Sequence, residues 1–199
     1  MNAAPAPPAR SASSTRGLDR SATALLPRLQ ALVDDAPDTA RPLFAANRAL
    51  RDQADPVEGL WQLATTLREF RGDAHLAVLA DRELDACEAL VLAAATGRVP
   101  RDTMRVDRGW TEEDWAAATD RLRARNLVDA HGDATALGHS ARTRIEEDTD
   151  RLAARLLRPL PPAESDHLLE LLTPLARRVL AADLLPFPNP IGLPRPDAP

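Results

Sequence analysis

The stretch of residues 84–157 constrains this chain more than any other, because apolar spacing, helix caps and helix breaks alternate along it. Apolar side chains at helical spacing begin at Leu84 and stop before Gly97, whose lack of a Cβ suits a left-handed helix end. Pro100 then stands in the first turn of a short helix that Gly109 ends. These signals predict two consecutive helices, the second short and rich in arginine.

A third helix is expected directly after Gly109. Thr111 is a good N-cap for it, and Trp110 and Trp115 are spaced to pack together across that cap as a hydrophobic staple. The helix opens with three acids, Glu112-Glu113-Asp114, which favour a helix N-terminus electrostatically.

A short β-hairpin is predicted next. Residues 127–129 and 134–137 flank a turn at residues 131–133, and helical spacing returns from Ala141 to Leu156. Three helices, a hairpin and a long helix are the order of elements in a winged helix-turn-helix. The predicted fold is therefore all-α with a small β-hairpin wing, flanked by N-terminal and C-terminal helices.

The chain is expected to divide into five segments. Residues 1–17 form an Ala/Pro/Ser-rich tail that is expected to be disordered, and residues 18–83 form a helical region. The winged-helix core takes residues 84–157, C-terminal helices take residues 158–185, and residues 186–199 form a proline-rich extended tail.

Two helix boundaries are expected inside residues 18–83. Asp55 and Pro56 place a cap residue and a first-turn proline at the start of one helix. Gly72 is a natural stop for that helix, and Asp73 can cap the next one. A glycine turn of this kind aims side chains from two helices into one space.

Composition bounds the functions that this chain can have. All 25 basic residues are arginines and the formal net charge is −5, so nucleic acid would bind only where charge is strongly polarised. The single cysteine, Cys87, lies on an apolar helix face and is expected to be a buried, inert thiol. With no signal peptide or apolar span, a cytoplasmic location is expected. Four histidines without short ligand spacing predict no metal site, and no cofactor motif is present.

Two resemblances sharpen these expectations. Residues 84–157 resemble the winged-helix core of MarR-like regulators, and residues 42–194 resemble an actinobacterial helix-turn-helix family of mostly unassigned function. The second rests on Arg41-Pro42-Leu43-Phe44-Ala45-Ala46-Asn47, Leu67-Arg68-Glu69-Phe70-Arg71-Gly72-Asp73-Ala74-His75, Arg108-Gly109-Trp110-Thr111-Glu112-Glu113 and Pro186-Phe187-Pro188-Asn189-Pro190-Ile191-Gly192-Leu193-Pro194. Proteins similar to this chain usually have a longer helical N-terminal region, and commonly a histidine where this chain has Phe70.

Arginines at helical spacing suggest a DNA interface. The second helix of the motif would cross the DNA backbone while the third lies in the major groove. The candidate phosphate contacts are Arg101, Arg105, Arg108, Arg121, Arg123 and Arg125. Eight acids stand against nine arginines between residues 98 and 144, and three of these acids open the third helix. The predicted fold favours DNA binding, whereas the acidic residues disfavour it.

A second cluster surrounds Gly72. The candidate ligand-binding residues are Arg68, Arg71, Asp73, His75 and Trp61. Arginine binds carboxylate or phosphate bidentately, and an Asp–His pair orients an imidazole for acid–base work, so His75 and Asp73 are also the catalytic candidates. The plainer interpretation is that Asp73 caps its helix and the arginines form salt bridges.

Three functions remain open on the sequence alone. The first is a MarR-like regulator that senses a small anionic or aromatic ligand and binds double-stranded DNA as a homodimer. Its dimer interface would come from Ile145, Leu152, Leu156 and residues 168–179. The second is a winged-helix protein that does not bind DNA but binds or converts a small molecule at the polar cluster. The third is a chain whose missing N-terminal helices come from a partner.

Overall fold

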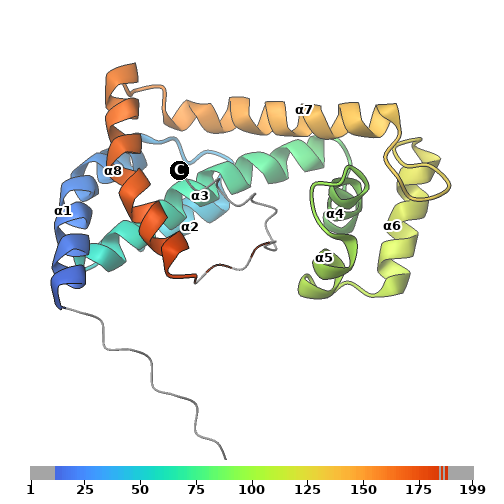
Figure 1. The fold of residues 1–199 in the computed structure, drawn as a ribbon. Helices are drawn as coiled ribbons and strands as arrows, with labels where there is room; N and C mark the ends of the chain where they lie inside the picture. The colour runs from blue at the N-terminus through green and yellow to red at the C-terminus, as the bar shows by residue number, and fades with distance from the viewer. Residues whose placement is uncertain (1–11, 184, 186, 188–199) are drawn as a thin grey trace, which may run out of the picture. The chain divides into compact units, whose positions relative to one another are not determined.

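The computed structural model describes residues 12–183, together with Leu185 and Phe187. This described part contains eight α-helices and one 3-10 turn and no β-strand (Figure 1). The helices are α1 (Ala12–Asp35), α2 (Pro42–Arg48), α3 (Pro56–Asp81), α4 (Ala86–Ala95), α5 (Arg101–Asp107), α6 (Glu112–Ala124), α7 (Ala136–Ala153) and α8 (Pro162–Ala181), with the 3-10 turn at Ala154–Leu156.

The chain folds as two compact units. Among the described residues, the first unit comprises residues 12–70 and 156–178, and the second comprises the remainder. Helix α3 contributes its first part to the first unit and residues 71–81 to the second.

The first unit has a core built by α1, α2, the first part of α3 and α8. Phe44 and Phe70 are completely buried there, with ring centroids 5.1 Å apart in an edge-to-face arrangement. Leu25 and Leu63 are also completely buried in this cluster, and Leu168 of α8 closes it.

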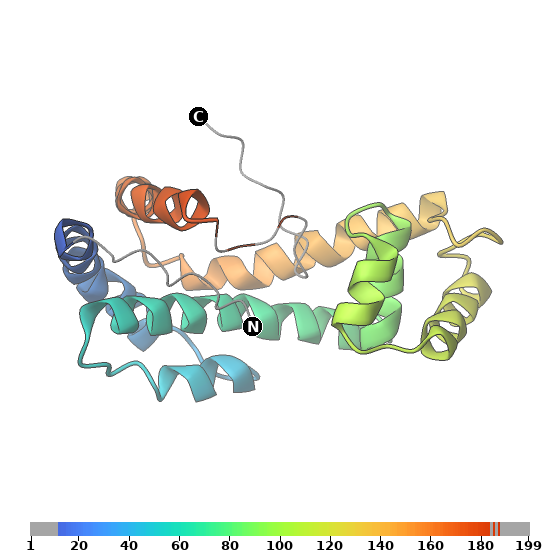
Figure 2. The same ribbon diagram turned by 60° about the horizontal axis from the view of Figure 1, so that its bottom comes forward.

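The second unit has its own core around α4. Helices α5 and α6 both pack on α4, and Figure 2 shows the three helices gathered together, in green to yellow. Leu92, Trp115, Leu122 and Ile145 are buried in this core. Cys87 is buried there as expected, and this burial raises the pKa of its thiol.

Helix α3 begins as the sequence predicts but does not break at Gly72. The Asp55 carboxylate accepts hydrogen bonds from the amides of Val57 (2.8 Å) and Glu58 (3.1 Å), which confirms the predicted cap. The predicted stop is wrong, because α3 is one helix of 26 residues. Glycine costs a helix interior about 1 kcal/mol. Burial of Ala74 and its neighbours on the same helix offsets that cost.

The predicted β-hairpin wing is wrong. Residues 127–137 contain one antiparallel bridge, between Val128 and Ala134, and the part of the chain that the structure describes has no strand. The Asp129 carboxylate accepts hydrogen bonds from the amides of His131 (2.8 Å) and Asp133 (3.0 Å) and so forms a tight turn in place of a ladder.

The second predicted strand is instead the start of a helix. The Thr135 hydroxyl accepts a hydrogen bond from the Gly138 amide (3.0 Å) and caps α7, so Ala136 and Leu137 lie in the first helical turn. The alternation of apolar and polar residues at 134–137 indicated a strand. The cap that the Thr135 side chain provides instead favours a helix.

Much of the apolar stripe from which a dimer was predicted packs inside the chain, while Leu169 and Val179 of α8 stay exposed. Ile145 is buried in the second core and Leu168 in the first, and Leu152 and Leu156 pack against these cores. The predicted extended tail lies outside the described residues except at Phe187, and so does most of the predicted N-terminal tail, since α1 begins at Ala12. No helix in the described part is both long and apolar enough to span a bilayer.

Candidate DNA interface and an arginine-rich polar cluster

Helices α5 and α6 are joined by a short turn that is fixed at both ends. Gly109 adopts φ +74°, and the Trp110 amide donates a hydrogen bond to the Arg105 carbonyl (3.0 Å), which closes the end of α5. The Thr111 hydroxyl accepts from the Asp114 amide (3.1 Å), and the Asp114 carboxylate accepts from the Thr111 amide (3.1 Å). The predicted N-cap is therefore confirmed, as a reciprocal capping box.

The Arg105 side chain holds this turn. Its guanidinium donates a hydrogen bond to the Trp110 carbonyl (3.2 Å) and pairs with the Glu112 carboxylate (2.8 Å). Only 17% of the side chain is exposed. Arg105 therefore connects the end of α5, the turn and the start of α6. Its role is structural, because its guanidinium is occupied by these contacts.

Helix α6 has an apolar inner face and an acidic outer face. Trp115, Ala118 and Leu122 are buried against α4. The residues on the opposite, exposed side are Glu113, Ala116, Ala117, Asp120 and Ala124. The centre of the helix that would enter a groove therefore carries carboxylates and methyl groups, with arginines only at its flanks.

Two of the flanking arginines stabilise the unit. Arg121 pairs with Glu88 (2.9 Å), a carboxylate that is 4% exposed, and with Asp85 (2.5 Å). Arg125 donates to the carbonyls of Arg82 (2.9 Å) and Glu83 (3.0 Å), which directly follow α3. Removing Arg121 would leave the Glu88 carboxylate without its cation. Arg121 is therefore engaged within the unit and is not available to contact DNA.

Arg101 and Arg123 are held more loosely. Arg101 is 59% exposed and its guanidinium lies 3.7 Å from Glu112. Arg123 is 42% exposed and pairs with Asp120 (2.5 Å), and its Nε donates to the Asp129 carbonyl (3.2 Å). Exposed pairs of this kind contribute about 0–1 kcal/mol, so an incoming anion can displace them.

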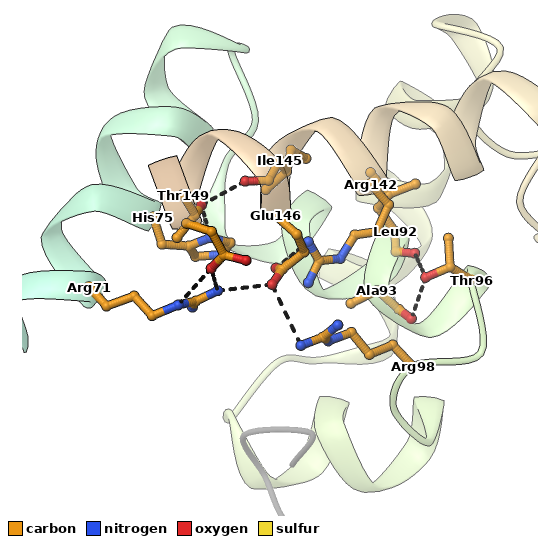
Figure 3. Close-up of polar contacts among 11 residues, drawn as sticks. Arg71, His75, Leu92, Ala93, Thr96, Arg98, Arg142, Ile145, Glu146 and Thr149 are labelled. Atoms are coloured by element: carbon orange, nitrogen blue, oxygen red, sulfur yellow. Dashed lines mark hydrogen bonds and ion pairs between the residues drawn. The ribbon is translucent and has the colours of Figure 1, made fainter. Parts of the chain in front are cut away.

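A polar cluster joins the second part of α3 to α7 (Figure 3). The Arg71 guanidinium pairs with Glu146 (3.0 Å) and Asp150 (2.9 Å), and His75 Nδ1 lies 3.2 Å from the Thr149 hydroxyl. Two of the predicted ligand residues, Arg71 and His75, are thus brought together on one face of α3.

Glu146 is the centre of this cluster. Besides Arg71, the guanidinium groups of Arg142 (2.6 Å) and Arg98 (3.6 Å) reach its carboxylate (Figure 3). Burial by itself would raise the pKa of Glu146, but the three arginines outweigh it and hold the pKa below the ordinary value. Arg98 lies in the connection between α4 and α5, so Glu146 ties that connection to α3 and α7.

The tautomer of His75 follows from its partner. The Thr149 hydroxyl donates its hydrogen to the Ile145 carbonyl (2.7 Å), so its oxygen can only accept from His75. Neutral His75 therefore carries its proton on Nδ1 and leaves Nε2 as an acceptor. Burial lowers the pKa of His75, and the nearby Arg142 lowers it further, which favours this neutral form.

The other predicted cluster residues do not join this group. Asp73 is buried, and as a near neighbour of His75 on a continuous helix it points to a different side, so the predicted Asp–His pair does not form. Arg68 pairs with Glu69, and Trp61 is 72% exposed; both belong to the first unit.

The sequence interpretation missed the partners that complete the cluster, namely Arg98, Arg142, Glu146, Thr149 and Asp150. One signal was available, since Arg142 and Glu146 stand four residues apart on a helix and form an ion pair of the usual i,i+4 type. Among the described residues, no group of three histidine, cysteine or acidic side chains is placed to hold a metal ion.

Comparison with known proteins gives one match. A family model described as a helix-turn-helix family matches residues 8–186, which is most of the chain. No curated protein and no solved structure matches the chain.

Proposed function

Because the chain belongs to the helix-turn-helix family, we propose that it is a DNA-binding transcriptional regulator. The observation that carries this proposal is the α5–turn–α6 motif, in which a left-handed glycine end and a capping box fix the angle between two helices. In this arrangement α6 enters the major groove and α5 crosses the DNA backbone.

The geometry divides the six predicted DNA-binding arginines into two classes. Arg101 and Arg123, with the exposed Arg108 on the turn, are the phosphate contacts of this proposal. Arg105, Arg121 and Arg125 hold the unit together through Glu112, Glu88 and the end of α3. Without a wing, the neighbouring loop of residues 129–133 is the nearest further element that could approach the duplex.

The acidic residues of α6 affect both the affinity and the sequence preference expected of the proposed interface. Glu113 and Asp120 would repel phosphates, so few backbone contacts are expected and affinity should be modest. Carboxylates can, however, accept a hydrogen bond from the N4 amino group of cytosine. The preferred sites are therefore expected to present cytosines to the centre of α6.

The finer part of the proposal is a response to a small molecule, as in MarR-like regulators. It is supported by the polar cluster, because Arg98 connects the helix-turn-helix to α3 and α7 within one unit. A ligand at the predicted residues Arg71 and His75 that displaced Glu146 would thereby release Arg98 as well.

The second candidate function is a small-molecule-binding protein that keeps the fold and does not bind DNA. The acidic outer face of α6 favours it, because a groove-reading helix normally presents donors to phosphates and bases.

A salt-dependent DNA titration separates the two candidates. Fluorescence anisotropy would follow binding of the protein to its own upstream DNA at about 50 and 200 mM salt, where phosphate contacts weaken steeply. The Arg101→Ala, Arg123→Ala double variant should lower the salt slope by about 2, and Arg68→Ala, an exposed arginine of the other unit, should leave it unchanged. Absence of binding at the lower salt by a folded protein would overturn the regulator and favour the second candidate.

A further inference from the structure

The connection between α4 and α5 is held to the rest of the second unit by a small set of contacts. Its buried side chain is Val99, which packs with Met104 of α5 on Ala93 of α4. Helix α5 has only seven residues and depends on such packing for its stability. Arg98 adds an ion pair from this connection to Glu146 of α7. Through this pair the polar cluster acts on the helix-turn-helix.

Of the three arginines that reach Glu146, Arg98 is the most easily released. Its guanidinium lies 3.6 Å from the carboxylate, beyond hydrogen-bond distance, and 46% of its side chain is exposed. Arg71 also pairs with Asp150, and Arg142 stands four residues from Glu146 on the same helix. An exposed pair at such a distance contributes little free energy, so a competing charge next to Glu146 can replace it.

His75 is placed to supply that charge (Figure 3). Neutral His75 donates from Nδ1 to the Thr149 hydroxyl, which leaves Nε2 free to take up a proton. The charged groups that act on the imidazole are Arg71 on its own helix, Arg142 and Glu146 on α7, and Arg98 on the connection between α4 and α5. An imidazolium would be a fourth cation in this group, attracted by Glu146 and repelled by the three arginines.

We propose that His75 is a proton-operated switch on the helix-turn-helix. Nε2 binds a proton from solvent and becomes a second donor, the imidazolium takes a share of the Glu146 carboxylate, and Arg98 leaves for solvent. The connection before α5 then loosens. This switch needs no small molecule, so it is distinct from a ligand response at Arg71.

The switch operates in mildly acidic solution. Burial, together with the nearby Arg142, holds the pKa of His75 below its ordinary value of 6.5, so the imidazolium forms only below that pH. The pKa of Glu146 is lowered from 4.5, so its carboxylate stays ionised where the imidazolium first forms. The proton is therefore taken up while Glu146 can still exchange one cation for another.

Hydrogen exchange of the ¹⁵N-labelled full chain tests the switch through two matched amides. The Met104 amide donates to the Pro100 carbonyl (3.1 Å) in the first turn of α5, and the Trp115 amide donates to the Thr111 carbonyl (3.2 Å) in the first turn of α6. Protection factors correct each rate for the intrinsic effect of pH. From about pH 7.5 to about pH 5.5, the Met104 protection factor should fall about tenfold relative to that of Trp115. An equal fall at both amides would mean a global loss of stability and would overturn the proposal.

Two histidine variants assign the effect. His75→Gln has a side chain that can still donate to Thr149 but takes up no proton, so the ratio of the two protection factors should not change with pH. His131→Gln removes an exposed histidine of the same unit and should behave as the parent does. A His75→Gln variant in which the ratio still falls would show that another group is responsible.

Arg98→Gln tests the route from His75 to α5. The side chain is half-exposed, so the variant is expected to fold, and it removes the ion pair to Glu146 at every pH. Met104 protection should therefore be low relative to Trp115 at both pH values. A ratio that is high near pH 7.5 and falls on acidification, as in the parent, would mean that Arg98 does not carry the effect.

The consequence for DNA rests on the proposed function, in which α5 crosses the DNA backbone. Acidification over the same range should raise the Kd for DNA about fivefold more in the parent than in His75→Gln. If Met104 protection falls selectively and the Kd rises in this way, both proposals stand. If protection falls selectively and no DNA binds at either pH, the switch stands and the regulator fails.

Two further outcomes separate the steps. If DNA binds and the ratio of the two protection factors stays constant with pH, the regulator stands and the switch is wrong. If the ratio falls but the Kd for DNA changes equally in the parent and in His75→Gln, the switch stands and its effect on DNA is wrong.

Discussion

The Arg41 guanidinium lies 3.5 Å from the centroid of the Phe70 ring and also donates a hydrogen bond to the Phe70 carbonyl. Arg41 is buried, and its guanidinium contacts a ring face and a backbone oxygen inside the core of the first unit. The same ring packs edge to face on Phe44, which follows Arg41 closely in the sequence. The Arg41-Pro42-Leu43-Phe44 stretch therefore anchors α2 to α3 through one aromatic side chain.

Replacing Arg41 should destabilise the first unit. Arg41→Met keeps much of the volume but removes the cation–π contact and the donor to the Phe70 carbonyl, at a cost of about 2 kcal/mol. Urea unfolding followed by circular dichroism measures this. Arg28→Ala is the control, because the Arg28–Glu164 pair of the same unit is half-exposed and should contribute less than about 1 kcal/mol. Equal losses in the two variants would contradict the anchoring role of Arg41.

Gly138 should not tolerate even an added methyl group. An alanine Cβ at this position would lie 2.0 Å from the Leu127 carbonyl oxygen, a backbone atom that also accepts the Thr135 amide hydrogen bond. Gly138→Ala should therefore lower the free energy of unfolding by about 1–3 kcal/mol, although alanine favours a helix. Gly59→Ala meets only the flexible end of Leu26 at 3.1 Å and should change stability by less than about 1 kcal/mol.

His75 should make stability depend on pH near neutrality. Its pKa in the folded chain is below the ordinary value of about 6.5, so the unfolded chain binds the proton more readily. The contribution of neutral His75 is present above that ordinary value and is lost as pH falls below it. The parent should lose stability between pH 7.5 and 5.5, and His75→Gln should lose clearly less over this range.

The Glu146 carboxylate acts in a different pH range and does not obscure this result. The pKa of Glu146 is lowered from 4.5, so its contribution is present above that value and is lost only at more acidic pH. Urea denaturation curves at several pH values would follow both steps. Parallel curves for the parent and His75→Gln between pH 7.5 and 5.5 would contradict the role given to His75.

Arg121 and Arg101 should respond differently to the same substitution. Arg121→Ala leaves the buried Glu88 carboxylate without its cation and should lower the midpoint of urea unfolding. Arg101→Ala removes a loosely held, exposed side chain and should leave the midpoint near that of the parent while weakening DNA binding. A parent-like midpoint for Arg121→Ala would mean that Arg121 is available for DNA after all.

Local capping signals predicted the helix starts well. Asp55 and Thr111 cap their helices in the structure as the sequence indicates, since each cap depends only on residues two or three positions away. The helix stop predicted at Gly72 was wrong because packing, as well as intrinsic propensity, decides where a helix breaks. The predicted hairpin was wrong because Thr135 can either cap a helix or lie in a strand, and in the structure its hydroxyl caps α7.

The polar cluster was harder to predict than the helices. Arg71 and His75 were singled out, but the Asp73–His75 pair depended on a turn at Gly72 that does not exist. Glu146 is 75 residues from Arg71 along the chain, and only the packing of α7 on α3 brings them together. A single sequence carries no signal for such a pairing.

The turn between α5 and α6 and the loop between α6 and α7 set opposite limits on how chains of this design can vary. The turn has no spare residue, because an insertion next to Gly109 or Thr111 would break either the helix end or the capping box. The loop is closed by the hydrogen bonds of Asp129 and by the bridge between Val128 and Ala134, and its exposed tip at His131 contributes no helix cap. Lengthening that tip would leave both helices intact, so chains of this design can vary there while the geometry of α5 and α6 stays fixed.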